Sequence, residues 1–164
     1  MLPTSDLLTA VMASLPDLGT DWVPLSGGRP NSVWRVGGIV IKAYDTSRAT
    51  FLFANRPQDE YLALSSFGSL GMAPIVLAHG EDWIAYCHIE GKTWTSDPVP
   101  VANLLGRLHS LPPGGLQFAR RNNAPAAIVR EAVFRANMAG LESPSLQPPD
   151  VATQPPSIVH GDAV

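Results

Sequence analysis

The sequence predicts an α+β fold, in which a small antiparallel β-sheet with one inserted helix precedes a helical part. Short runs rich in β-branched and aromatic residues occupy much of the first half of the chain, separated by glycine-containing turns. Between them, residues 57–67 begin with proline and carry apolar residues at helical spacing. After Glu90 and Gly91 the apolar spacing becomes helical. We therefore expect two domains, residues 1–90 and residues 91–164.

The first expected element is a short amphipathic helix over residues 4–15. Thr4 or Ser5 can cap it, and Pro16 ends it. Its apolar stripe is expected to comprise Leu8, Val11, Met12 and Leu15. Beyond a β-hairpin, the other expected elements are strands over residues 22–25, 73–78 and 83–89, and helices over residues 57–67, 99–111 and 126–139.

The hairpin lies in residues 25–44. Two apolar runs meet at Gly37 and Gly38, a pattern typical of two strands joined by a tight turn. Because side chains alternate along a strand, Val40 and Lys42 are expected on one face and the isoleucines beside them on the other.

The same stretch carries the main functional signal. A lysine on an inner face needs an anion, and the loop before the hairpin contains Gly27 and Gly28. Glycine has no Cβ, so the backbone N–H groups of such a loop can approach phosphate oxygens. The pattern indicates a clamp for a nucleoside triphosphate. The residues alone leave two alternatives open. In one, Lys42 extends to solvent, and in the other, Gly27 and Gly28 form an ordinary tight turn.

The composition limits the classes of partner. The chain has 164 residues, of which 45% are hydrophobic and 15% charged, and its net charge is −3. No basic patch dominates, so no nucleic-acid partner is expected. No apolar run reaches membrane-span length and no signal peptide is recognisable, so no membrane partner is expected. The single cysteine, Cys87, fits a reducing compartment, and a cytoplasmic location is expected.

Seven motifs occur in one order along the chain, and in that order they resemble the aminoglycoside phosphotransferase and choline kinase superfamily, which phosphorylates small molecules. The motifs are Leu25-Ser26-Gly27-Gly28 with Asn31, Lys42, Glu60, Gly71-Met72-Ala73-Pro74, Ile89-Glu90-Gly91, Leu108-His109 and His160-Gly161-Asp162. The resemblance implies a protein-kinase-like fold, with an antiparallel β-sheet N-lobe followed by the start of a helical C-lobe.

The resemblance also implies a reaction and residue roles. ATP, with Mg²⁺, would give its γ-phosphate to a hydroxyl of a small metabolite or an aminoglycoside-like acceptor. Lys42 would pair with Glu60 and reach the phosphates, and Asp162 would be the catalytic aspartate. The other implied cofactor contacts are Gly27, Gly28, Asn31 as a brace of the loop, Val40 against the adenine, and backbone groups near Cys87, His88 and Ile89. The alternatives are a surface Glu60 that interacts with the helix dipole and an Asp162 that merely occupies a turn.

The chain departs from the family pattern after Asp162, because it ends two residues later. The family's next asparagine and aspartate hold the magnesium, so most metal ligands are expected to be missing from this copy. We expect an incomplete phosphotransferase that does not turn over by itself. A non-catalytic nucleotide-binding or regulatory module, and a folded remnant without a ligand, remain alternatives. The acceptor and the oligomeric state stay open.

Overall fold

The computed structural model describes residues 2–26, 30–49, 55–91, 95–112, 125–143, 145 and 147–148. The chain divides into two compact units, Met1–Gly106 and Arg107–Val164. The predicted domain boundary at residues 90 and 91 stays a prediction. No helix in the described part is long and apolar enough to cross a membrane.

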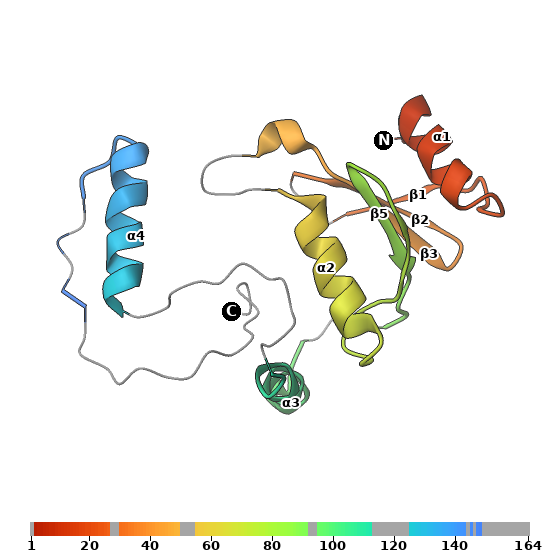
Figure 1. The fold of residues 1–164 in the computed structure, drawn as a ribbon. Coiled ribbons are helices and arrows are strands. Elements are labelled where there is room, and N and C mark those ends of the chain that lie inside the picture. The colour runs from red at the N-terminus through yellow and green to blue at the C-terminus, as the bar shows by residue number, and fades with distance from the viewer. Residues whose placement is uncertain are drawn as a thin grey trace. The chain divides into compact units, whose positions relative to one another are not determined.

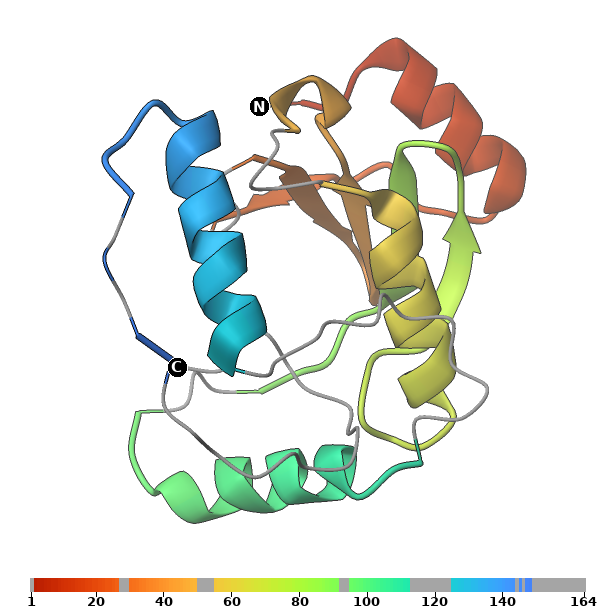
Figure 2. The same cartoon turned by 60° about the vertical axis from the view of Figure 1, so that its left-hand side comes forward.

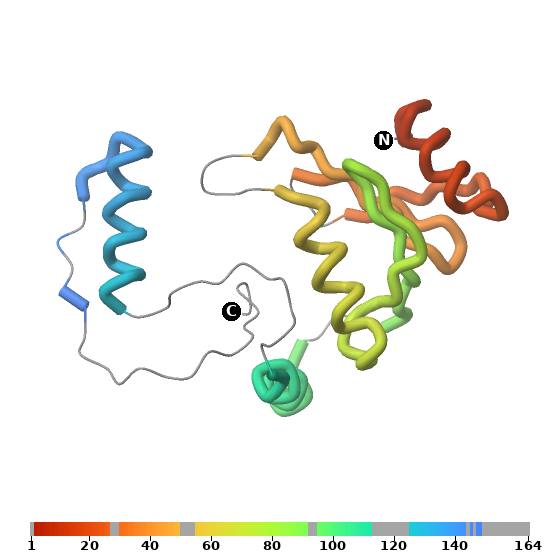
Figure 3. Tube along the Cα trace, in the orientation of Figure 1, coloured from red at the N-terminus to blue at the C-terminus, as the bar shows by residue number. Residues whose placement is uncertain are grey.

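An antiparallel five-stranded sheet is the centre of the first unit (Figure 1). Its order is β1-β2-β3-β5-β4. The strands are β1 (Val23–Leu25), β2 (Ser32–Val36), β3 (Ile39–Ala43), β4 (Val76–His79) and β5 (Trp83–Cys87). Helix α2 (Pro57–Gly68) is inserted between β3 and β4, as Figure 3 traces. The predicted sheet with one inserted helix is therefore confirmed.

The β2–β3 hairpin turns at Gly37 and Gly38, as predicted, with Val36 opposite Ile39. Gly37 has a φ of 57°, a left-handed conformation that favours glycine. On β3, Val40 is paired with Tyr86 and Lys42 with Ile84. Val40 and Lys42 consequently share a face of the sheet, also as predicted.

Helix α1 (Ser5–Ser14) covers the opposite face. The Thr4 hydroxyl caps it by accepting the N–H of Leu7 at 3.3 Å. The predicted stripe is wrong by one residue: Leu7 and Val11 are buried, whereas Met12 is 42% exposed. The helix turns the face containing Leu7 and Val11 toward the large aromatic side chains of the sheet.

The core lies between α1 and this face of the sheet. Its buried members are Leu7, Val11, Leu18, Trp34, Val36, Ile41, Trp83 and Ala85. A Cβ at Gly80 would collide with the indole of Trp83, so the turn between β4 and β5 requires glycine there. Contacts of α2 with Lys42 and Tyr44 place this helix on the other face (Figure 2).

The element ends differ from the predicted ones mainly in β4 and β5. Strand β4 begins at Val76, not at residue 73, and β5 ends at Cys87, two residues early. The register between these strands shifts between Val76 and Ala78, which interrupts the regular ladder. The predicted proline at the first turn of α2 is confirmed, with Arg56 as its N-cap.

Two further helices follow the sheet. They are α3 (Pro98–His109) and α4 (Pro125–Met138), close to the predicted ranges. Neither has a buried residue among those described. Within α4, Arg135 pairs with Glu131 one turn earlier at 2.7 Å.

Candidate functional site

The ion pair expected from the sequence is present. The Lys42 ammonium on β3 contacts the Oε2 atom of Glu60 on α2. Their side chains are 22% and 29% exposed, so the pair is partly shielded from water while a ligand can still reach it. The alternative of a lysine that simply extends to solvent is therefore wrong.

A tyrosine completes this pair. The Tyr44 hydroxyl donates to the same Glu60 oxygen at 2.5 Å, and the Lys42 ammonium lies 4.9 Å from the centroid of the Tyr44 ring. Burial, and secondly the hydrogen bond to Glu60, raise the pKa of Tyr44, so the hydroxyl keeps its proton. Sequence reasoning missed Tyr44, although its position two residues after Lys42 predicts the same face.

The negative charge of Glu60 also affects a second tyrosine, Tyr86. Burial raises the pKa of Tyr86 to about 12, and the charge of Glu60 adds to the shift. Tyr86 is paired with Val40, which is buried in the sheet. This face thus combines apolar side chains such as Val40 with the charges of Lys42 and Glu60.

A pair of asparagines joins the end of the glycine-containing loop to the start of α2. The Asn31 amide donates to the Asn55 side chain at 2.9 Å, and the Asn55 amide donates back at 3.0 Å. Asn31 also accepts the N–H of Asp45 at 3.2 Å, and Asn55 donates to the carbonyl of Asp45 at 2.8 Å. Asn31 is thus bonded to Asn55 and Asp45, its expected role as a brace of the loop stays a prediction, and Asn55 was not among the expected site residues.

The expected adenine contacts lie at the end of β5. The N–H of Cys87 donates to the Ile75 carbonyl at 2.9 Å, and the N–H of His88 donates to the Gly38 carbonyl at 2.8 Å. Both amides therefore extend the sheet. Ile89, the next residue, is 64% exposed.

A charged cluster borders this strand end. Glu90 accepts from Arg35 at 2.8 Å and lies 3.4 Å from Nδ1 of His88. Arg35 also donates to the carbonyl of Gly37 at 2.8 Å. Because Arg35 is paired with Val40, these contacts connect the residues after β5 with the Lys42 face of the hairpin.

Three expected site residues, Gly27, Gly28 and Asp162, lie outside the described residues. Among the described residues, no group of three or more His, Cys, Asp and Glu side chains could hold a metal ion. The described residues fit a nucleotide phosphate through the Lys42 ammonium, and the magnesium expectation stays a prediction.

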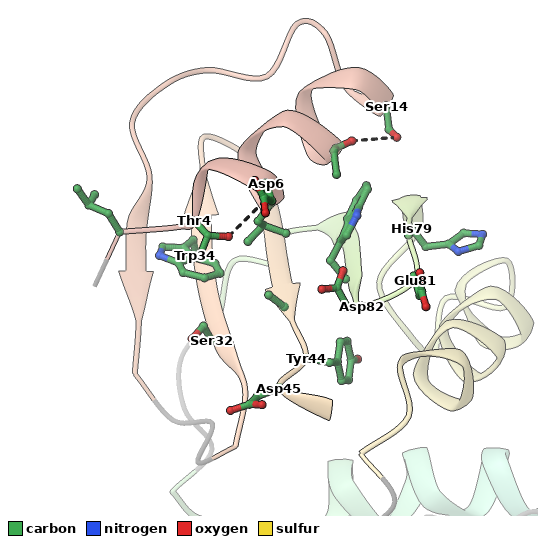
Figure 4. A pocket seen from close by; sticks show the side chains of 16 residues that line it. Thr4, Asp6, Ser14, Ser32, Trp34, Tyr44, Asp45, His79, Glu81 and Asp82 are labelled. Carbon is green, nitrogen blue, oxygen red and sulfur yellow. Dashed lines mark hydrogen bonds between the residues drawn. The ribbon is translucent and has the colours of Figure 1, made fainter. Parts of the chain in front are cut away.

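A hollow of about 680 Å³ lies elsewhere, between α1, the first half of β2, the end of β3 and the β4–β5 turn. Figure 4 shows the carboxylates of Asp6, Asp45, Glu81 and Asp82 around it. Its lining includes Tyr44 but neither Lys42 nor Glu60. The predicted nucleotide residues therefore do not form this hollow.

No family model and no curated protein sequence matches this chain. Solved structures do. The complex of APH(2″)-IIa with streptomycin and ATP aligns at 11% identity and a TM-score of 0.55, covering 87% of this chain and 54% of that chain. The gentamicin complex of APH(2″)-IIa aligns at 12% identity and 0.64, covering 87% and 53%.

A choline/ethanolamine kinase family protein from Mesorhizobium loti aligns at 18% identity and a TM-score of 0.55, covering 80% of this chain and 46% of that chain. The present chain thus spans about half the length of the solved structures it matches. The α+β fold of this chain, with its antiparallel sheet and inserted helix, is the kinase-like fold of the aminoglycoside phosphotransferase and choline kinase structures.

Proposed function

We propose that this chain carries the nucleotide-binding part of an ATP-dependent phosphotransferase that acts on a small hydroxyl-bearing molecule. One observation carries the proposal: the Lys42–Glu60 pair lies on the sheet face shared with Val40, in a kinase-like fold. Phosphoryl transfer requires positioning and charge neutralisation, and a strand lysine paired with a helix glutamate supplies a fixed cation for phosphate oxygens.

The proposed nucleotide contacts follow from this face. Lys42 binds phosphate oxygens, Val40 packs against the adenine, and Gly27 and Gly28 present backbone N–H groups to the phosphates. The amides of Cys87 and His88 bond within the sheet, so the backbone of Ile89 is the better candidate for hydrogen bonds with the base. Asn31 acts indirectly, through its bonds with Asn55 and Asp45.

The chemistry would need groups beyond this face. Asp162 is proposed to accept or orient the proton of the acceptor hydroxyl, the role that a catalytic aspartate has in this reaction class. Mg²⁺ would neutralise charge on the phosphates when bound with the nucleotide. A small acceptor is supported by the streptomycin and gentamicin in the complexes of similar fold.

Nucleotide binding by the 164-residue chain tests the proposal. Wild-type protein and the Lys42→Ala variant are titrated with ATP by calorimetry, with and without Mg²⁺. We expect Lys42→Ala to weaken ATP binding by about 1–3 kcal/mol, the range for a charge-assisted contact. The fold should survive, because β3 packs into the core through Ile41 on its other face.

The matched control is Arg56→Ala, which removes a cation from an exposed pair with Asp59. This variant should bind ATP like the wild type. Undetectable ATP binding by the wild type, or unchanged binding by Lys42→Ala, would contradict the proposal. Tight binding that does not depend on Mg²⁺ would favour the non-catalytic nucleotide-binding module instead.

A further inference from the structure

We propose that Tyr44 is a positioning residue of the nucleotide site, which holds Glu60 and flanks Lys42 so that the ammonium remains directed at phosphate oxygens. The inference rests on the proposed function and deepens it. Its basis is a closed set of three contacts: Lys42 to Glu60, Tyr44 to Glu60, and Lys42 to the Tyr44 ring.

The tyrosine is anchored more firmly than the lysine it accompanies. Tyr44 directly follows β3, its N–H donates to the carbonyl of Asp82 at 2.7 Å, and the residue is 7% exposed. Lys42 reaches Glu60 through a flexible four-carbon stem. The phenol therefore gives the carboxylate on α2 a rigid connection to the sheet that does not depend on the lysine.

The shared oxygen explains why this connection matters for a ligand. Oε2 of Glu60 accepts hydrogen bonds from both the Lys42 ammonium and the Tyr44 hydroxyl. The one hydrogen bond from the phenol satisfies part of the carboxylate's demand for donors, while an ammonium has three N–H donors to distribute. With Tyr44 in place, Glu60 can orient Lys42 and still leave donors of the ammonium for a phosphate.

The chemistry of the phenol fits a permanent donor. Burial and the neighbouring Glu60 raise the pKa of Tyr44, so its hydroxyl does not become a second anion beside the carboxylate. The ring adds a cation–π contact with the ammonium. Tyr44 therefore favours one position of the ammonium through two different groups.

The Tyr44→Phe variant removes the hydroxyl and keeps the ring. Dissociation constants for ATP and for adenosine are measured for this variant and for the wild type, together with melting temperatures. We expect ATP affinity to fall about threefold to tenfold, a part of what a hydrogen bond to a charged group can contribute. Adenosine affinity should not change, because adenosine has no phosphate for Lys42 to bind.

Two further variants test whether Tyr44 acts through Glu60. Tyr61→Phe is the matched control, because Tyr61 neighbours Glu60 in α2 but its ring packs at a tilt against His79, with centroids 4.0 Å apart. It should bind ATP like the wild type. Glu60→Gln tests the same contact from the other partner, and adding Tyr44→Phe to it should cause no further loss of ATP affinity.

Each outcome decides between the proposals. Wild-type ATP affinity in Tyr44→Phe, or equal losses for ATP and adenosine, overturns the positioning role. Additive losses in the double variant also overturn it. If the wild type fails to bind ATP, or Lys42→Ala binds it unchanged, the proposed function fails instead. Should Tyr44→Phe not fold, the ATP-to-adenosine ratio of Glu60→Gln decides, with an unchanged ratio overturning the inference.

Discussion

At the residue scale, the site depends on one carboxylate with two donors. Glu60 receives the Lys42 ammonium and the Tyr44 hydroxyl on the same oxygen, and all three side chains lie on the sheet face opposite the core. Lys42 and Glu60 are 22% and 29% exposed, so their attraction is partly screened by water. The pair is consequently better suited to orient a cation than to hold the fold together.

Glu60→Gln tests this division between orientation and stability. The amide keeps the shape of the side chain and loses its charge, so Lys42 loses its ionic partner. We expect the free energy of unfolding to fall by about 1 kcal/mol or less, because water still screens part of the attraction in this partly exposed pair. The free energy of ATP binding should be weakened by more than this amount. Titration measures the affinity for ATP, and thermal unfolding measures the stability. A collapse of the melting temperature with unchanged ATP affinity would show that Glu60 is only structural.

Residue-scale prediction succeeded where a single strand decides the outcome. The alternation of β3 correctly separated Lys42 and Val40 from Ile41, and a charged group beside apolar neighbours correctly predicted a partner for Lys42. Tyr44 was missed because its contact with Glu60 joins β3 to a helix 16 residues further on. The angle at which α2 crosses the sheet decides that contact, and no local pattern encodes this angle.

At the element scale, the asparagine pair fixes where α2 begins. Asn31 precedes β2 and Asn55 precedes α2, and their side chains donate to each other at 2.9 and 3.0 Å. Asn55 is buried and has a φ of 43°, a conformation that asparagine tolerates better than most residues. The pair thereby links the loop next to the expected phosphate contacts with the helix that carries Glu60.

Substitutions at Asn55 separate the contribution of its side-chain hydrogen bonds from that of its backbone conformation. Asn55→Ala loses the hydrogen bonds of the side-chain amide and puts alanine, which tolerates a positive φ less well than asparagine, at this position, so we expect a loss of about 2–4 kcal/mol in unfolding free energy. Asn55→Gly loses the same bonds without the backbone cost, and should be less destabilised by about 1 kcal/mol. Denaturant unfolding measures both. Equal stability of the two variants would contradict the role of the backbone conformation, and wild-type stability of both would contradict the brace.

Element positions were predictable to the extent that their signals are local. Proline at the start of α2 and the glycine pair in the hairpin gave the right boundaries. The face of α1 was wrong by one residue, because Leu7, Leu8, Val11 and Met12 form two overlapping apolar stripes. Only packing against Trp34 and Trp83 selects the stripe that contains Leu7 and Val11.

At the scale of the whole molecule, the sheet has a different partner on each of its two faces. Its α1 face carries the core, which includes Ile41, Trp34 and Trp83, and the other face carries Lys42 with the contacts from α2. Ile41 and Lys42 thus face different partners although they are adjacent in β3, while Val40 and Tyr44 are also buried on the Lys42 side. The kinase-like fold was predicted from the order of motifs, each of which is weak alone, and the solved structures of similar fold confirm it.

This separation predicts how the molecule responds to a nucleotide. A ligand that binds only the folded state stabilises it by about 2.7 kcal/mol at a hundredfold excess over its dissociation constant. Because the proposed contacts lie on β3, α2 and the end of β5, ATP should slow amide hydrogen exchange in these elements beyond the general effect on unfolding. Exchange in α1, which packs on the core face, should show only the general effect.

Hydrogen exchange of the full chain, followed residue by residue with ATP and with adenosine, measures this pattern. Adenosine should protect the end of β5, and ATP should additionally protect the segment of β3 around Lys42 and the first turns of α2 around Glu60. In Lys42→Ala the additional protection should vanish while protection near the end of β5 remains. Protection by ATP confined to α1, or equal in all elements, would place the nucleotide away from the ion pair, because a ligand that touches neither β3 nor α2 cannot slow their local opening selectively.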